Sequence, residues 1–590
     1  MEDKKIINKT FSKIEIVFSK IVANKNILLL VIVPLILLLI DKRWIFPNPF
    51  SGFADDWLYT GYFLNFQSFY SEFGNIYFVS RLPWIMPGYL FYNLFPVNIS
   101  VYLLHLTFYY CSIISLFLIL KYTIGEQAGF LSALLFSFYP FFMREIGANY
   151  VLGPIIAYLL LTLLMITKSK NSKNRFFFLF FAGSFSILML FSNLFTIVLL
   201  PTIILYYIVI HNNGFRKEFI LSAAAFALGA IFIFGLMCIF NMILTGSFDF
   251  YSPQIHALFY YSTWTNEWWH PLSEWIFNAP WMILPTIGVI ISIIYVIVFI
   301  HSSEKRNIVH LFFVLNFLIV FFIFFVMELY GKPVLESVYY IAMLIPFFFL
   351  ALGPFFHKIF EEINDKNGIL FSYSCILILI SGYILETKSL TINYLFNDTL
   401  LLAIVAFLIV LIIAIICCFN RVLNQQNLIA LGLLLICLFG MLYIGNFSFA
   451  FKNGFDSYEN GYYSILDSAI QIKKTFPESD VKFWYNANES YEELSYGSFF
   501  TLVNCVYLWG YSKYSSEFPL LPPSKVANIT FSEEYQNIAV LSTDDNAFEL
   551  VNLSFSNYDK KPVFISRNVI HHNKIRYNLF LLKLPKITSQ

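Results

Sequence analysis

Residues 219–242 read FILSAAAFALGAIFIFGLMCIFNM and contain no charged side chain. A helix of about 20 apolar residues crosses the hydrocarbon core of a bilayer, which is roughly 30 Å thick. This stretch is therefore predicted to span a membrane, and most of the 590-residue chain is similarly apolar. Hydrophobic residues make up 59% of the chain and charged residues only 12%. A soluble protein cannot bury that much apolar surface, so we expect lipid to be the main solvent.

Comparable apolar stretches recur along the first three quarters of the chain. Together they predict about thirteen membrane spans, although several are nearer 15 residues than the usual ~20. The predicted spans lie near 27–40, 99–120, 127–143, 151–167, 176–190, 193–210, 219–242, 281–300, 308–327, 335–353, 368–385, 399–419 and 428–445. The pair within 176–210 is the least distinct, because only Ser192 and Asn193 interrupt it. The predicted fold class is mainly α, a polytopic protein of the plasma membrane.

The basic residues predict the orientation. If residues 1–26 are a cytoplasmic segment, the short inner loops hold about three times as many Lys and Arg residues as the outer ones, which is the bias expected of cytoplasmic loops. An odd number of spans then places the C-terminus outside. The long segments 41–98, 243–280 and 447–590 all fall on the outer face. Lys42 and Arg43, directly after the first span, are the main exception.

The chain changes character at about Phe447, where charged residues become frequent. We therefore divide it into a transmembrane domain, 27–446, and an external C-terminal domain, 447–590. Segment 462–476 has helical apolar spacing, and three short runs have the composition of strands. Those runs are 481–485, 537–541 and 574–582. A small α/β or α+β domain is predicted here.

Several functional classes lack their signatures. The net charge of +1 gives no field that would attract nucleic acid. The seven Cys residues form no CxxC or zinc-ligand spacing. Walker, dinucleotide, HExxH and nucleophile-elbow motifs are also missing from the sequence. The inner loops are too short to hold a cytoplasmic domain for a nucleotide-sugar substrate.

The first outer loop carries the most informative pattern, FADDWLYTGYFLNFQSFYSEFGNIYFVSRLPWIMPGYLFYNLFP at 53–96. Asp55 and Asp56 open a predicted surface helix, where the helix dipole favours negative charge. RLPWIMPGY is then expected to turn the chain into a second apolar segment. The acidic pair is read either as a helix cap with a solvated neighbour, or as a general base or metal ligand facing a cavity.

This loop resembles that of the GT-C glycosyltransferases, which include protein O-mannosyltransferases, aminoarabinose transferases and oligosaccharyltransferases. In that family an acidic residue on a surface helix follows span one, and an Arg-x-Pro motif and a second amphipathic helix come next. The architecture is similar over roughly the first 450 residues. Local likeness is confined to 53–90, to Arg144–Pro154 and to the loop 246–285.

The resemblance implies a sugar donor on a polyprenyl phosphate or diphosphate, drawn from the membrane lipid. A first-loop Asp would act as the base on the acceptor hydroxyl or amine, and the anomeric configuration would invert. Asp55 is favoured over Asp56 by motif alignment only. A lipid phosphate is an adequate leaving group, so the enzyme needs a base, cations for the phosphate and a dry cavity.

One feature of the family pattern is missing. Many members carry a second acidic residue near the position of NYVLGP at 149–154, where this chain has no carboxylate. The nearest is Glu145, beside Arg144. Glu145 could be a second acid or metal ligand and Arg144 a phosphate contact, or the two could form a salt bridge at a span end. A divalent cation is therefore left open as a cofactor.

Other candidates lie in the outer loops. Arg81 is read either as a phosphate contact or as an interfacial arginine whose head group reaches the surface. Lys332 is a second candidate for the phosphate. The aromatic loop 249–275 is read as an interfacial belt or as a cover over the substrates. Its candidate contacts are His256, Trp264, Glu267, Trp268, Trp269 and His270, and zinc ligation by His256, His270 and Glu267 is the least supported alternative.

Two other functions compete with a glycosyltransferase. A lipid or polysaccharide transporter usually shows repeated halves and helices broken near mid-membrane, and no halves repeat here. A membrane-anchored binding protein would use its external domain and could dispense with the acidic pair. For the enzyme, the acceptor class (glycan, lipid or protein), the sugar and the polyprenyl chain are left open by the sequence.

Overall fold

The computed structural model describes most of residues 25–362 and the core of the C-terminal domain. The described residues are 25–40, 55–147, 149–170, 172–211, 217–263, 282–301, 307–332, 334–335, 338–362, 468, 471–472, 474–476, 481–486, 537–549, 563–572 and 575–583. The predicted spans 368–385, 399–419 and 428–445 and the domain boundary near Phe447 lie outside them.

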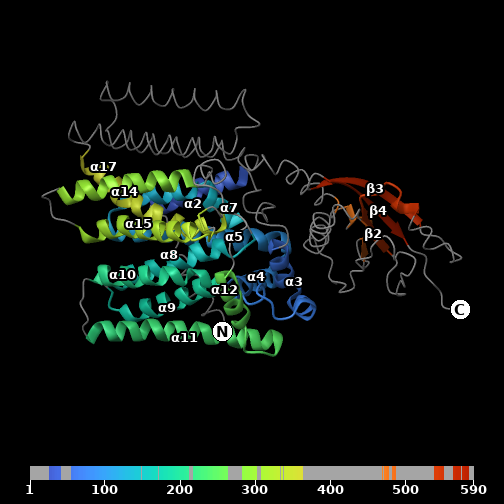
Figure 1. Cartoon of the computed structure of the whole chain (residues 1–590), viewed down its shortest axis with the longest axis horizontal. Helices are drawn as coiled ribbons and strands as arrows, with labels where there is room; N and C mark the ends of the chain where they lie inside the picture. The colour runs from blue at the N-terminus through green and yellow to red at the C-terminus, as the bar shows by residue number, and fades with distance from the viewer. Residues whose placement is uncertain are drawn as a thin grey trace, which may run out of the picture.

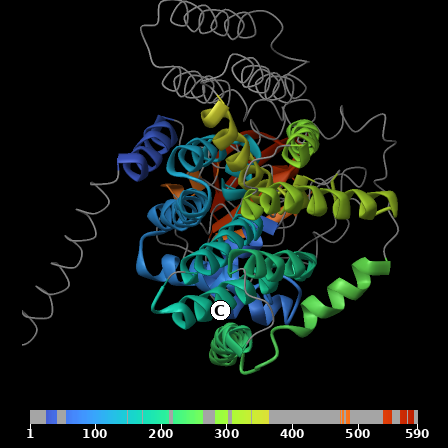
Figure 2. The same ribbon diagram turned by 90° about the vertical axis from the view of Figure 1, so that its left-hand side faces the viewer.

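Most of the first 362 residues form helices that pack side by side (Figure 1). Their bounds are α2 Lys25–Ile40, α3 Asp55–Phe73, α4 Leu82–Leu94, α5 Val97–Thr123, α6 Glu126–Ser137, α7 Pro140–Gly147, α8 Leu152–Ser169, α9 Arg175–Ser192, α10 Leu200–His211, α11 Lys217–Thr245, α12 Ser252–Thr263, α14 Ile283–His301, α15 Ile308–Leu329, α16 Val338–Ile341 and α17 Ile345–Glu362. Figure 2 looks roughly along the long helices. The buried core between them consists mainly of aliphatic and aromatic side chains.

Six described helical segments are long and apolar enough to cross a membrane, in agreement with a polytopic membrane protein. They are Ile99–Thr123, Leu152–Ser169, Arg175–Ser192, Leu194–His211, Glu218–Thr245 and Ile308–Leu329. The expected span at 127–143 is instead two short helices, α6 and α7. Pro140 begins the second of these, where its missing N–H leaves no intrahelical bond unmade.

Asn193 separates the two closely spaced spans. Its backbone is extended, and its side-chain oxygen accepts a hydrogen bond from the backbone N–H of Phe195. This is the cap that Asn forms at the start of a helix. It begins the 3-10 turn η2, Leu194–Leu199, which leads directly into α10. The prediction of two spans within 176–210 is confirmed.

Helices α9 and α11 approach each other more closely than ordinary side chains allow. A Cβ added at Gly183 would clash with the carbonyl oxygen of Phe226, and one added at Gly229 would clash with that of Phe180. The Ser184 hydroxyl also donates to the carbonyl of Gly229 across this contact, at 3.0 Å. Small residues and a buried hydroxyl are how membrane helices pack tightly without a hydrophobic driving force.

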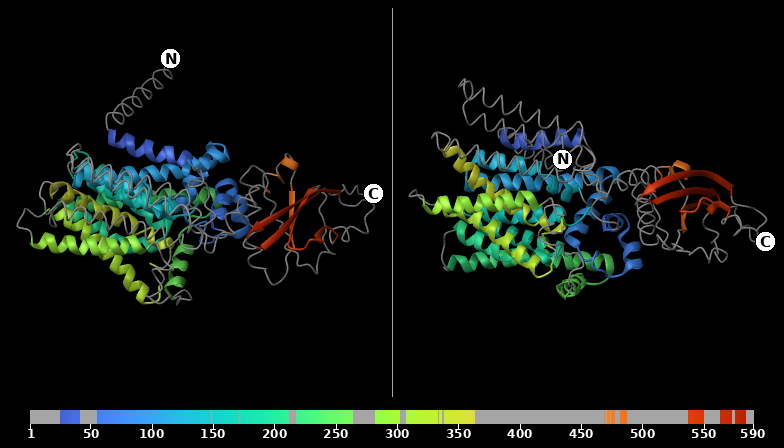
Figure 3. Two further views of the ribbon diagram at one scale, coloured as in Figure 1. Left: turned by 90° about the horizontal axis from the view of Figure 1, so that it is seen from above. Right: turned by 45° about the horizontal axis from the view of Figure 1, so that its top comes forward.

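The first-loop helices α3 and α4 lie at one end of the bundle, and the C-terminal sheet lies beyond that same end (Figure 3). Helix α4 begins at Leu82, inside the RLPWIMPGY segment that was expected to be a turn. Pro83 is tolerated because it stands in the first turn of the helix. The two segments predicted to be outside are thus at the same end of the molecule.

The C-terminal domain contains a four-stranded sheet in the order β1-β2-β4-β3. The strands are β1 Val481–Asn486, β2 Asn537–Ser542, β3 Val563–His572 and β4 Ile575–Lys583. Strands β1 and β2 are parallel, whereas β4 runs antiparallel to both β2 and β3. Three of the four strands were predicted, and the described residues between 468 and 475 are helical as expected.

Candidate functional site in the first outer loop

Helix α3 starts at the predicted acidic pair. Asp55 and Asp56 are its first two residues, so their backbone positions are at the positive end of the helix dipole. The structure describes the backbone but not the side chains of these two residues. One turn later, Tyr59 and Thr60 are both buried, at 0% and 2% exposure. Part of the predicted surface helix is therefore buried against the rest of the protein.

Arg81 is the charged centre of this region. Its side chain is only 1% exposed, which is not the surface-reaching arrangement of an interfacial arginine. Its Nη1 donates to the hydroxyl of Tyr59 at 2.5 Å, and Nη2 donates to that of Tyr77. The guanidinium also lies 3.9 Å from the centre of the Tyr77 ring and 5.0 Å from that of Tyr150. Three tyrosines from separate segments thus enclose one cation.

No carboxylate contacts this guanidinium within the described part of the chain. Burial acts to lower the pKa of Arg81, but the oxygens of Tyr150, Tyr59 and Tyr77 outweigh it and hold the pKa well above its usual value. The group therefore stays charged. Among the described residues its Nε makes no hydrogen bond. The described partners of the guanidinium are hydroxyls and aromatic rings, which stabilise the cation without neutralising its charge and leave it able to attract a bound anion.

A second polar contact joins α3 to the segment between α7 and α8. The side-chain amide of Asn149 donates to the hydroxyl of Thr60 at 2.6 Å, and both residues are buried. The ring of His105, on α5, lies beside the Asn149 side chain and the backbone of Ile146. Neither ring nitrogen of His105 makes a hydrogen bond of good geometry. The indole of Trp84 packs edge-on against that ring, with the centroids 6.0 Å apart.

The structure thus brings Arg81 to the first helical turns of α3, next to the segment that follows α7. It also places Glu145 on α7, buried at 1% exposure, and Arg144 beside it in the backbone. Lys332 is half-buried just beyond α15, and His256 is exposed on α12. The other aromatic-loop candidates lie outside the described residues: Trp264, Glu267, Trp268, Trp269 and His270.

Metal ligands do not cluster in the described region. No group of three or more His, Cys, Asp or Glu side chains there is arranged to hold an ion. The zinc alternative involves Glu267 and His270, which lie outside that region. The site chemistry that can be assigned from contacts is therefore that of a buried cation and its tyrosine partners.

Sequence reasoning missed the residues that surround the candidates. Tyr59, Tyr77, Tyr150 and Asn149 were not selected, because a chain with 38 Tyr gives no reason to prefer any of them. Helical spacing offered one usable signal. Tyr59 and Thr60 follow the two aspartates by four residues, which places them on the same helix face one turn later.

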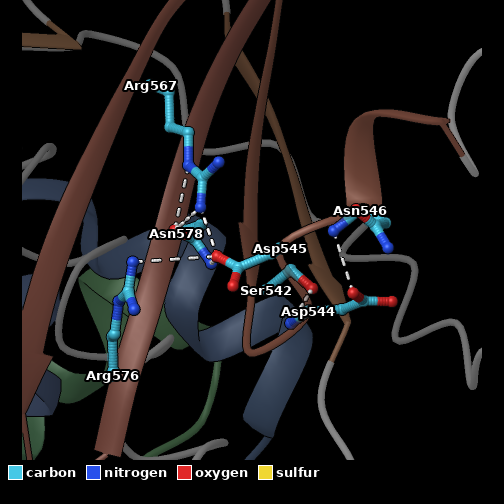
Figure 4. A network of polar contacts seen from close by, with 7 residues as sticks. All are labelled: Ser542, Asp544, Asp545, Asn546, Arg567, Arg576 and Asn578. Atoms are coloured by element: carbon cyan, nitrogen blue, oxygen red, sulfur yellow. Dashed lines mark hydrogen bonds and ion pairs between the residues drawn. The ribbon is translucent and has the colours of Figure 1, made fainter.

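The C-terminal domain has a polar network of its own (Figure 4). One carboxylate oxygen of Asp545 accepts from Nη2 of Arg567 and from the amide of Asn578, and Nη2 of Arg576 lies 3.8 Å away. Side chains within the turn 542–546 hold it in place. These ion pairs are substantially exposed, and exposed pairs contribute little to stability. We interpret the network as fixing the turn after β2 against the β3–β4 hairpin.

Comparison with solved structures identifies ArnT from Cupriavidus metallidurans, a GT-C aminoarabinose transferase, as a similar fold. The apo structure of ArnT matches 95% of this chain and 98% of its own, with a TM-score of 0.54 and 12% sequence identity. The structure of ArnT bound to undecaprenyl phosphate matches 94% and 97%, with a TM-score of 0.50 and 12% identity. No family model and no curated protein sequence matches the chain. The likeness confirms the predicted GT-C-like fold.

Proposed function

We propose that this chain is a membrane glycosyltransferase that moves a sugar from a polyprenyl-phosphate-linked donor to an acceptor at the outer face of the membrane. The observation that carries the proposal is the enclosed cation next to α3. Arg81 is buried, is held by tyrosines, contacts no carboxylate in the described region, and is bonded to α3 one turn from its acidic start. Similarity to ArnT, whose structure was solved with undecaprenyl phosphate, supports the class of donor.

The charge of Arg81 suits a phosphate leaving group. Guanidinium groups form short, charge-assisted bonds with phosphate oxygens. When the glycosidic bond breaks, negative charge develops on the departing phosphate, and a fixed cation in a dry site stabilises that charge. The tyrosine hydroxyls that now accept from Arg81 would turn toward the incoming anion or be displaced by it. Arg144 and Lys332 are further candidates for the same phosphate.

The proposed step balances with one base. The first-loop carboxylate removes the proton from the acceptor hydroxyl or amine while the acceptor atom bonds to the anomeric carbon. The bond from that carbon to the phosphate oxygen breaks on the opposite side, so the configuration inverts. Polyprenyl phosphate leaves with the electron pair, and the proton stays on the carboxylate until water takes it. The step requires no metal, although Glu145 remains the proposed second acid or metal ligand.

Helical spacing now favours Asp55 on structural grounds. Asp55 lies four residues before Tyr59, which bonds Arg81, whereas Asp56 lies four residues before Thr60, which bonds Asn149. Residues four apart share a helix face. Position 55 therefore lies on the same helix face as the tyrosine that bonds Arg81. Position 56 lies on the same face as the threonine that bonds Asn149.

The test measures sugar transfer from a panel of radiolabelled polyprenyl-phosphate sugars by purified protein in lipid nanodiscs. Wild type, Asp55→Asn and Asp56→Asn are compared, with Glu126→Gln as the matched carboxyl-to-amide control. Glu126, on α6, pairs with Lys121 of α5 and is 44% exposed, so its variant should transfer normally. We expect Asp55→Asn to lose transfer or donor hydrolysis by at least about 100-fold, as for loss of a general base, while still binding the donor.

Three outcomes would contradict parts of this proposal. Activity that survives both aspartate substitutions would remove the base assignment and direct attention to Glu145. Loss of transfer in Asp56→Asn alone would reverse the choice between the two positions. A wild-type protein that binds none of the donor lipids would overturn the enzyme and favour a transporter or a membrane-anchored binding protein.

A further inference from the structure

Gln254 links three segments that are far apart in the sequence. It lies on α12 and is 1% exposed. Its side-chain amide nitrogen donates to the carbonyl of Ser80 at 2.9 Å and to that of Phe191 at 2.8 Å. One NH₂ group has two protons, so both are used. A single side chain therefore connects the first outer loop to the end of a membrane-spanning helix.

The Phe191 side of this link is a fixed point. Phe191 is in the last turn of α9, where backbone carbonyls have no partner within the helix and need one from outside. The segment directly before α12 is held by an apolar cluster of Leu82, Met237 and Phe250, against which Phe191 packs. Helix α12 contacts η2 and lies at the same end of the bundle as α4 (Figure 1). Gln254, four residues after Phe250, thus caps α9 from the first turn of a helix whose preceding segment is packed against the bundle.

The Ser80 side of the link leads directly to the cation. Ser80 is the residue before Arg81, and its hydroxyl donates to the carbonyl of Tyr77 at 2.5 Å. The backbone N–H of Arg81 donates to the carbonyl of Phe78 at 3.2 Å. Residues 77–81 therefore form a closed turn that carries both Arg81 and Tyr77, one of its enclosing tyrosines. Gln254 bonds this turn from outside, at the carbonyl next to Arg81.

We infer that Gln254 is a positioning residue, which holds the turn 77–81 so that the Arg81 guanidinium is set for the phosphate of the donor. Nothing in the sequence selects Gln254, because it acts through a contact 174 residues away in the chain. A merely stabilising role would affect the whole fold. A positioning role affects recognition of the phosphate in particular, because that is what Arg81 supplies. The inference rests on the proposed function, in which Arg81 binds the phosphate.

The experiment compares binding of undecaprenyl phosphate and of undecaprenol, the same lipid without its phosphate, to protein in nanodiscs. Gln254→Met keeps the length and volume of the side chain but removes both donated bonds. Gln127→Met, at an exposed position on α6, is the matched control. Arg81→Met marks complete loss of the cation. Thermal unfolding of each variant is measured alongside.

We expect wild type and Gln127→Met to prefer the phosphorylated lipid, and Arg81→Met to lose that preference. Gln254→Met should reduce the preference about tenfold by weakening only phosphate-lipid binding, since a misplaced binding group costs on this order or more. A double variant with Tyr77→Phe should show non-additive effects, because the Tyr77 hydroxyl and Gln254 both fix the position of Arg81. If Gln254→Met does not yield monodisperse protein, Gln254→Asn, which is too short to reach both carbonyls, replaces it.

Four results would contradict the inference or part of it. If wild type and Arg81→Met prefer the phosphate while Gln254→Met keeps the full preference, the positioning role is wrong, and phosphate binding by Arg81 is overturned as well. If Arg81→Met loses the preference and Gln254→Met keeps it, only the positioning role is wrong. A wild type without any preference overturns the donor site itself. Equal weakening of both lipids in Gln254→Met assigns that residue to general stability instead.

Discussion

The contact between α9 and α11 gives a stability prediction whose size follows from the structure. Gly229 lies on α11 where this helix crosses α9. Real Cβ atoms essentially never come within 3.0 Å of a heavy atom elsewhere in the protein. A Cβ added at Gly229 would lie more than about 1 Å closer than this limit to the carbonyl oxygen of Phe180. The obstacle is backbone, not a flexible side chain. Gly229→Ala must therefore force the two helices apart.

A matched control lies on the same helix. A Cβ added at Gly235 meets nothing within 4 Å, so Gly235→Ala changes only the helix itself. Replacing Gly by Ala inside a helix gains up to about 1 kcal/mol, and that gain applies to both variants. Their difference isolates the crowding at Gly229, which costs about 1–3 kcal/mol for an overpacked contact. Separation would also stretch the bond from Ser184 to the Gly229 carbonyl.

Thermal unfolding in detergent, followed by intrinsic tryptophan fluorescence, measures this difference. We expect Gly235→Ala to unfold at or above the wild-type temperature and Gly229→Ala clearly below it. Gly183→Ala, whose Cβ would meet the Phe226 carbonyl oxygen from the other side of the crossing, should behave like Gly229→Ala. If Gly229→Ala and Gly235→Ala unfold at the same temperature, the helices do not cross at this distance and the reasoning is refuted.

Substitutions at two further positions test buried polar contacts in the same assay. Asn149→Ala removes the donor that bonds Thr60 and should lower stability by about 1 kcal/mol. Transfer activity should fall as well, because α3 loses this contact. Unchanged activity would show that the position of α3 does not matter for transfer. The carboxylate of Glu328 accepts from the backbone N–H groups of Val334 and Leu335 at 2.6 and 2.7 Å. Glu328→Ala should therefore cost on the order of 2 kcal/mol or more, whereas Glu328→Gln, which keeps an acceptor oxygen, should cost less; equal losses would show that charge, not the acceptor, matters.

Hydrophobic length was sufficient to predict the six described helical segments that are long and apolar enough to cross a membrane, because the bilayer demands about 20 apolar residues whatever the partners are. Even the closely spaced pair at 176–210 was predictable, since Asn193 is a residue that starts helices. The interruption at 138–139 was not, because an apolar run continues through it. There the choice between one helix and two depends on packing and on Pro140, rather than on composition.

The C-terminal sheet shows the same limit in strands. Strand β4 is buried along residues 577–582, and its apolar run identified it. Strand β3 carries Arg567, Asn568 and two histidines, and it lies at the edge of the sheet in the strand order β1-β2-β4-β3. An edge strand is not required to be apolar on both faces. Its sequence therefore lacks the pattern by which buried strands are recognised.

The charged residues of the candidate site were predictable from the sequence, but the residues that surround them were not. The acidic pair and Arg81 stand out because charged residues are rare in this chain, and a charge near a membrane needs a reason to be there. Residues far away in the sequence decide whether a cation is already paired with a negative charge or can still bind an anion. For Arg81 these residues include Tyr59 and Tyr150. Arg81 is enclosed by groups that lower the cost of its burial without cancelling its charge. A paired arginine would have to break an ion pair to bind a phosphate, whereas the described partners of Arg81 are hydroxyls and aromatic rings, and this is why it suits the proposed phosphate site.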